Sequence, residues 1–290
     1  MSEYIVGSKN LNNGFEDDID ENTYNTLSQS KEILFEARSK ENIYNIILMN
    51  YYEFEKELFE ISLNYEIFTS DYQDFNNYIS KIEQRILNLL SSITLYLDSF
   101  KDDLKNTPKY SLHVKEEFQI IANYVEELRN NDKKIEIMQF LRNHIQHNGL
   151  LVENFSLNGV KLSDDLREQT LRFHIDKNKV KARGYKIEDY VGMEDDISLK
   201  KYMREYIDFI SSVHNQFRQT TNDKVKKARD SFEEILNKYP EHRYLYIAKK
   251  ENDVKTDEVA IFLNWDNIRV GLIQKNSVPT YFKRHSINTK

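Results

Sequence analysis

The chain has 290 residues, a formal net charge of −7, 39% hydrophobic residues and no cysteine. The apolar content is sufficient for a packed core, and the lack of cysteine excludes disulfides, thiolate nucleophiles and cysteine-bound zinc. The negative charge argues against a protein that coats nucleic acid without specificity, because such binding requires many cations to neutralise phosphates. It remains compatible with a local basic groove.

The start of the chain shows no sign of a membrane or export segment. No apolar run of about 18 residues occurs, and the N-terminus lacks a basic region followed by an apolar one. We therefore expect a cytoplasmic protein with no membrane partner. Residues 1–22 are polar, include the acidic run from Glu16 to Glu21 and show no sustained period, which predicts a disordered acidic arm.

Helical periodicity begins after this arm. Thr23–Ala37 and Ile43–Tyr65 are predicted as two amphipathic helices rich in Tyr and Phe. Ser70 or Asp71 is placed to cap the helix that follows.

Phe75–Leu104 carries the pattern of a helical-bundle seam. Its apolar residues alternate four- and three-residue steps; they are Ile86, Leu90, Ile93, Leu97, Phe100 and Leu104. Pro108 ends this helix, because proline cannot continue the hydrogen-bond ladder. Val114–Arg129 and Lys133–Asn148 are the next two predicted helices.

The pattern becomes mixed after Gly149. Asn158-Gly159 between alternating apolar residues predicts a β-hairpin around residues 152–176. Ser198–Lys238 returns to a helical pattern. Short strands are expected near the end, at Tyr244–Ile247, Glu258–Leu263, Ile268–Ile273 and Thr280–Phe282. The sequence thus predicts a mainly α protein: a disordered arm at 1–22, an antiparallel helical bundle at 23–240 with an inserted β-hairpin, and a small C-terminal β meander at 241–290.

The run Arg142-Asn-His-Ile-Gln-His147 lies near the end of the predicted helix Lys133–Asn148. At about 100° per residue, Asn143 and His147 share a face, whereas Arg142 projects about 140° away from His147. Arg142 and His147 can therefore meet at one phosphate only across a groove.

These residue types suit cleavage of RNA, whose 2′-hydroxyl is its own nucleophile. His147 has an ordinary pKa near 6.5 and can act as a general acid and base. Arg142 stays protonated, can grip two phosphate oxygens and can stabilise the pentacoordinate state. Asn143 can orient the imidazole or the substrate. We therefore assign Arg142, Asn143 and His147 as candidate catalytic residues without a cofactor, with His144 beside them as a contact to RNA.

The segment Phe140-Leu-Arg-Asn-His-Ile-Gln-His-Asn-Gly149 resembles the R-x4-6-H motif of the HEPN superfamily of helical ribonucleases. Ile86–Leu104 resembles the other core helix of such domains, so the likeness covers about a quarter of the chain. It implies a HEPN-like bundle, a metal-independent endoribonuclease of a bacterial defence or toxin system, and a homodimer whose site is completed by the same motif of a second subunit. Leu141, Ile145 and the aromatic residues of Ile43–Tyr65 are the expected interface residues.

Other interpretations stay open. The same fold can serve as a non-catalytic interaction or RNA-binding scaffold, partnered by an antitoxin or a larger defence complex. The chain can also be a bundle unrelated to RNA, in which Arg142 pairs with a surface carboxylate. A metal pair of His144 and His147 lacks a third ligand nearby.

Four cations recur at every second residue after the predicted hairpin, namely Lys177, Lys179, Lys181 and Arg183. An extended chain would place them on one face, as a track for the RNA backbone. An edge strand that lysines protect against aggregation explains the pattern equally well. By contrast, Lys224, Lys226, Lys227 and Arg229 on a helix indicate an ordinary solvated face.

Overall fold

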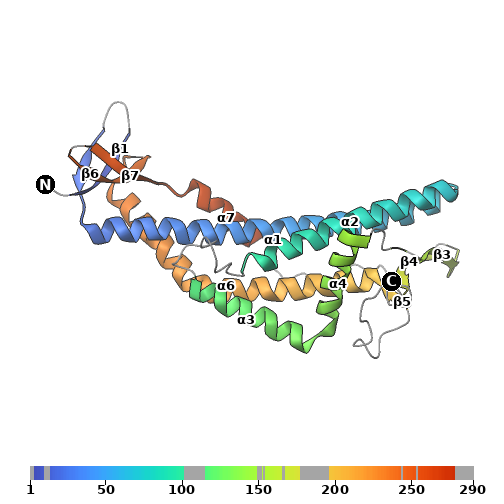
Figure 1. Cartoon of the computed structure of the whole chain (residues 1–290). Helices are drawn as coiled ribbons and strands as arrows, with labels where there is room; N and C mark the ends of the chain where they lie inside the picture. Colours follow the sequence, from blue (N-terminus) through green and yellow to red (C-terminus); the bar gives the residue numbers. More distant parts are fainter. Residues whose placement is uncertain are drawn as a thin grey trace. The chain divides into compact units, whose positions relative to one another are not determined.

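The computed structural model describes residues 3–9, 14–100, 115–148, 152, 154–164, 167–176, 196–242, 244–252 and 254–277. This part of the protein is mainly helical, with two small antiparallel sheets (Figure 1). It divides into a first unit, drawn from residues 1–42, 100–121 and 216–277, and a second unit, drawn from residues 43–99, 122–215 and 278–290. Two long helices, α1 (Glu21–Ile67) and α6 (Leu199–Lys238), contribute residues to both units.

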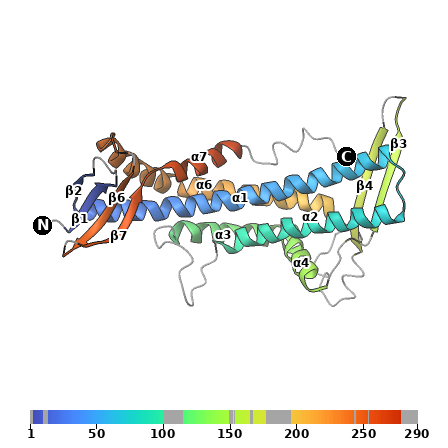
Figure 2. The same ribbon diagram turned by 90° about the horizontal axis from the view of Figure 1, so that it is seen from above.

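The first unit contains an antiparallel sheet that pairs strands from the first 18 residues with strands from residues 245–261. Its strands, in spatial order, are β2 (Glu16–Asp18), β1 (Tyr4–Ser8), β6 (Leu245–Glu251) and β7 (Val254–Ile261), as Figure 2 shows. Every residue of β1 is paired with β6, from Tyr4 opposite Lys249 to Ser8 opposite Leu245.

The expected disordered arm is therefore wrong for Tyr4–Ser8 and Glu16–Asp18. Ile5 and Val6 are buried, and burial of two β-branched side chains favours an ordered strand. The strand that stabilises β1 lies about 240 residues away in the sequence, so no local sequence pattern predicts this pairing.

The C-terminal region is not a separate β meander. The strands expected at Tyr244–Ile247 and Glu258–Leu263 correspond to β6 and β7, but residues 268–273 lie in a helix, α7 (Asn264–Lys275). Trp265 of α7 stacks on Phe35 of α1, with ring centroids 4.3 Å apart. The strand expected at 280–282 lies outside the described residues.

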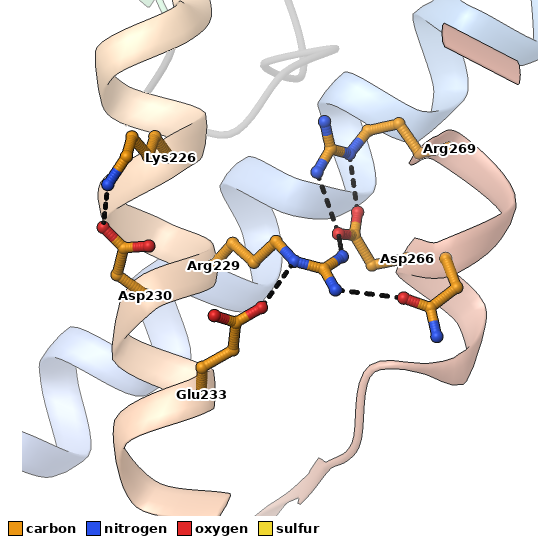
Figure 3. A network of polar contacts seen from close by, with 7 residues as sticks. Lys226, Arg229, Asp230, Glu233, Asp266 and Arg269 are labelled. Atoms are coloured by element: carbon orange, nitrogen blue, oxygen red, sulfur yellow. Dashed lines mark hydrogen bonds and ion pairs between the residues drawn. The ribbon is translucent and has the colours of Figure 1, made fainter. Parts of the chain in front are cut away.

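A buried ion network fixes α7 to α6 (Figure 3). Asp266 is fully buried and accepts hydrogen bonds from Arg269 Nε at 2.6 Å and from Arg229 Nη1 at 2.6 Å. Arg229, whose side chain is 25% exposed, thus belongs to this network and not to the solvated face that its sequence context suggested. Lys226, one turn earlier, does lie at the surface, where it pairs with Asp230 at 2.7 Å. These contacts explain α7, since a helix brings Asp266 and Arg269 together at i,i+3 spacing.

The second unit contains the helical part that carries the motif. Helix α2 (Tyr72–Asp98) begins at Asp71, whose side chain accepts hydrogen bonds from the backbone N–H groups of Gln73 and Asp74. The predicted cap is thereby confirmed. The described seam residues are buried, as expected: Ile86, Leu90, Ile93, Leu97 and Phe100. Helix α3 (Lys115–Asn131), which belongs to this unit from Ala122 on, and α4 (Lys133–Asn148) follow, separated by Asp132.

The hairpin after α4 is present, with its turn in a different place. Strands β3 (Asn154–Lys161), β4 (Arg167–Asp176) and β5 (Asp196–Ser198) form an antiparallel sheet in that order. Asn158 and Gly159 were expected to form the turn, but both lie inside β3, opposite Thr170 and Gln169 of β4. A Cβ added to Gly159 would meet nothing within 4 Å, so close packing does not require a glycine at this position. The two strands are connected by residues 162–166 instead.

Candidate functional site

Helix α4 presents one face to the protein interior. Four of its apolar side chains are buried, namely Ile135, Ile137, Met138 and Leu141. The helix packs against α2 of the same unit. This packing fixes which positions of the motif face solvent.

Arg142 and Asn143 lie beside that buried face and contact each other. Arg142 Nη1 donates a hydrogen bond of 2.9 Å to Oδ1 of Asn143, which is exposed. Arg142 Nε is buried and has no hydrogen-bond partner. Asn143, expected to orient an imidazole or the substrate, thus accepts a hydrogen bond from the guanidinium of Arg142. Of the five N–H donors of a guanidinium, one makes this bond and the Nε–H is buried.

The phenol of Tyr206 on α6 lies within electrostatic range of Arg142. Burial raises the pKa of Tyr206, while the positive charges of Arg129 and Arg142 act in the opposite direction. Arg129 comes from the end of α3, where its Nη1 donates to Glu126 Oε1 at 2.9 Å. Its Nε and Nη2 atoms are buried without hydrogen-bond partners. Two guanidinium groups from different helices thus act on one phenol.

Sequence reasoning missed Arg129. The residue belongs to no short motif, and its relation to Arg142 depends on how α3, α4 and α6 pack. The available signal was weak: one arginine in the last turn of the helix before the motif helix.

His144 differs from its expected role. Only 1% of its surface is exposed, and its ring centroid lies 5.8 Å from that of Phe140. The cause is helical geometry, because His144 comes seven residues after Ile137 and so shares the buried face. A direct contact between His144 and RNA is therefore not available in this conformation.

His147 lies in the last turn of α4, but its side chain falls outside the part that the structure describes. The basic track also lies outside that part: Lys177, Lys179, Lys181 and Arg183. Two residues just before the track are described on β4, where Arg172 is exposed and His174 is partly exposed opposite Ser198 of β5.

No family model, curated protein or solved structure matches the chain. Within the described ranges, no group of three or more His, Asp or Glu side chains is arranged to hold a metal ion. None of the helices in those ranges is long and apolar enough to cross a membrane.

Proposed function

We propose that the protein is a metal-independent endoribonuclease of the HEPN type, acting in a bacterial defence or toxin system. One observation carries this proposal. The guanidinium of Arg142 donates a hydrogen bond to Asn143, and Arg142 lies on the same helix as His147, near that helix's end. A cation and a titratable imidazole in one site are the minimum that this reaction requires.

The chemistry follows from the RNA itself. The 2′-oxygen attacks the adjacent phosphorus, so that the P–O2′ bond forms and the P–O5′ bond breaks. A neutral imidazole accepts the proton of the 2′-hydroxyl, and an imidazolium donates a proton to the leaving 5′-oxygen. The products are a 2′,3′-cyclic phosphate and a free 5′-hydroxyl. Arg142 stabilises the negative charge of the pentacoordinate phosphorane.

The imidazole of His147 can perform both proton transfers in turn, because accepting the proton of the 2′-hydroxyl makes it the imidazolium that donates to the leaving oxygen. A composite site takes Arg142 from one copy and His147 from the other. This arrangement answers the angular problem, because Arg142 and His147 project about 140° apart on a single helix. A twofold axis would use the same patch of both copies. Leu141, expected at such an interface, is fully buried, so the two copies must meet through other apolar surface.

A second candidate is a non-catalytic scaffold with RNA, an antitoxin or a larger defence complex as partner. The observation that favours it is a set of exposed apolar side chains on α1, among them Tyr52, Phe59 and Ile67. Exposed apolar surface of this kind marks protein interaction sites. This scaffold function requires no catalysis by the residues of α4.

Incubation of the purified protein with mixed RNA in EDTA tests the enzyme. We expect cleavage that leaves 2′,3′-cyclic phosphate ends and that Arg142→Ala and His147→Ala abolish. His242→Ala is the matched control, since His242 lies in the first unit beside Phe15. Loss of cleavage in the chelator, or products with 3′-hydroxyl ends, contradicts the mechanism. RNA binding without any cleavage supports the scaffold.

A further inference from the structure

A polar cavity lies where α1 ends and α2 begins, within the second unit. Its volume is about 530 Å³, which falls in the range of about 300–1,000 Å³ that small-molecule sites occupy. Residues 68–71 join the two helices (Figure 2), and the nine residues that line the cavity lie between Asn64 and Lys81. We call this cavity the α1–α2 pocket.

Uncharged polar side chains make up a large part of the lining. Four of them make no hydrogen bond to any other group in the part of the chain that the structure describes, namely Asn64, Thr69, Asn77 and Ser80. A carboxamide or a hydroxyl can both donate and accept hydrogen bonds. The pocket therefore offers donors and acceptors together, and none of these four groups carries a charge.

The two charged side chains of the lining already have partners within the chain. Lys81 Nζ lies 3.2 Å from Oε1 of Glu57, which is buried. Asp74 Oδ2 accepts a hydrogen bond of 3.0 Å from the backbone N–H of Asp71. Among the described lining residues there is thus no unpaired cation for a phosphate or a carboxylate, and the charge of Asp74 repels such anions.

The aromatic side chains of the pocket differ in exposure. Tyr78 is buried and packs edge-on against Phe75 with ring centroids 6.1 Å apart, and Phe75 in turn lies 5.8 Å from the ring of Phe155 on β3. These contacts fix one wall of the pocket before a ligand arrives, which lowers the cost of binding. Phe68, by contrast, is 65% exposed and leaves a ring open to a ligand.

We propose that the α1–α2 pocket binds a neutral ligand with many hydroxyl groups, a mono- or disaccharide. Sugar hydroxyls donate and accept hydrogen bonds, as the carboxamides and hydroxyls of the lining do. The C–H face of a sugar ring packs on an exposed aromatic ring such as Phe68. The carboxylate of Asp74 can accept a further, charge-assisted hydrogen bond from a sugar hydroxyl. An apolar ligand would leave the polar groups of the lining without partners, which is unfavourable.

A nucleobase fits the same pocket less well. Proteins hold a flat base between two aromatic or apolar faces, whereas Phe68 alone offers an open ring here. Asp71 is exposed beside the pocket, and Glu60 lies 3.9 Å from Lys81, so an RNA strand would bring its phosphates close to carboxylates. The sugar site therefore does not depend on the proposed RNA cleavage, and its binding is measured without RNA.

Saturation-transfer NMR of the full chain tests the proposal. The probes are the methyl glycosides of glucose, galactose, mannose and N-acetylglucosamine, each at millimolar concentration. We expect transfer to at least one of them, with a Kd of about 1 mM at the affinity per atom that is usual for small ligands. The absence of transfer to all four glycosides overturns the proposal.

Paired substitutions locate the binding site. Phe68→Ala and Asn77→Ala should each weaken glycoside binding by about three- to tenfold, because one removes the open ring and the other a free carboxamide. The matched controls are Tyr72→Ala and Asn76→Ala, since both residues are exposed on α2 but do not line the pocket. The controls should bind as the wild type does. All four positions are exposed, so circular dichroism should be unchanged. Equal loss in the pocket variants and the controls overturns the assignment.

Competition identifies the chemistry of the ligand. Neither inorganic phosphate nor adenosine, added at the same concentration as the glycoside, should reduce the transfer. Displacement by phosphate would show an anion site, and displacement by adenosine would show a nucleoside site. Either result overturns the assignment to a neutral sugar.

Discussion

The hydrogen bond from Arg142 Nη1 to Asn143 Oδ1, 2.9 Å long, joins two neighbours on the exposed side of α4. Successive helix positions diverge by about 100°, and Asn143 lies angularly between Arg142 and His147. The bond therefore draws the guanidinium toward the face on which His147 begins. We therefore assign Asn143 a positioning role toward the guanidinium of Arg142.

Asn143→Ala should therefore lower the rate of RNA cleavage without removing either reacting group. We expect kcat to fall by about 10- to 100-fold, the scale of a misplaced group, with a smaller change in KM, while Arg142→Ala abolishes activity. Single-turnover kinetics with a short RNA measure the two constants. Asn143→Gln, which keeps the carboxamide, should restore part of the loss. An Asn143→Ala enzyme as fast as the wild type contradicts the positioning role.

Mixing two inactive variants tests the composite site. Arg142→Ala and His147→Ala are each expected to be inactive alone, but in a heterodimer one of the two sites regains both residues. Partial activity should therefore return on mixing, up to about a quarter of the wild-type rate if subunits exchange at random and the motifs are shared. RNA cleavage measured after subunit exchange is the readout. Activity that stays absent, in a mixture shown to contain heterodimers, excludes a shared site.

Expression in bacteria provides a cellular readout. If the protein is a toxic ribonuclease, the wild-type chain should slow growth, and Arg142→Ala or His147→Ala should relieve the effect. An immunoblot checks that both variants accumulate to wild-type levels. Variants that remain toxic would place the effect elsewhere in the chain.

The helices with sustained periodicity could be predicted closely. The expected helix at Ser198–Lys238 corresponds to α6, Leu199–Lys238, and the motif helix has the predicted bounds of Lys133–Asn148. In both, the apolar repeat follows from contacts a few residues apart. The expected break between Ala37 and Ile43 is wrong, because α1 continues through it as one helix. Glu41, which lies in the expected break, forms an ion pair with Arg218 of α6. No local sequence pattern predicts this contact.

Long-range contacts decided the remaining elements. Strand β1 depends on its pairing with β6, and α7 depends on Asp266 meeting Arg229 of α6. At the candidate site, the sequence placed Arg142 and Asn143 together on a helix, but the burial of His144 follows from which face α4 turns toward the interior. The proximity of Arg129 required the packing of three helices. Local periodicity contains none of that information.

Asp266 gives a direct test of the buried network in the first unit. Asp266→Ala removes the carboxylate that Arg229 and Arg269 share and leaves two arginines without it, so the free energy of unfolding should fall by about 3–5 kcal/mol. Asp230→Ala, which breaks the exposed pair with Lys226 in Figure 3, should cost no more than about 0.5 kcal/mol. Urea unfolding measures both. Equal losses would contradict the buried role of Asp266.

Lys40 provides a stability test that depends on pH. Only 3% of its surface is exposed, and its Nζ lies 4.9 Å and 4.7 Å from the ring centroids of Phe100 and Phe118. Burial lowers the pKa of Lys40 from 10.5 to about 8. The unfolded chain therefore binds more protons than the folded one between pH 8 and pH 10.5, so this residue makes the protein more stable as the pH rises through that window.

Lys40→Met should remove the cost of burying the charge while it keeps the length of the side chain. At pH 7 we expect the variant to be more stable by about 1–3 kcal/mol, because the two aromatic rings offset part of the desolvation. The difference from the wild type should shrink as the pH rises from 8 to 10.5 and level off above that range, where Lys40 is neutral in both states. Urea unfolding of both proteins across this range measures it. Lys31→Met, at a half-buried lysine 6.0 Å from the ring centroid of Phe35, is the matched control and should show no such gain. A stability difference for Lys40→Met that is the same at pH 7 and pH 10.5 would contradict the titration of Lys40 in the folded protein.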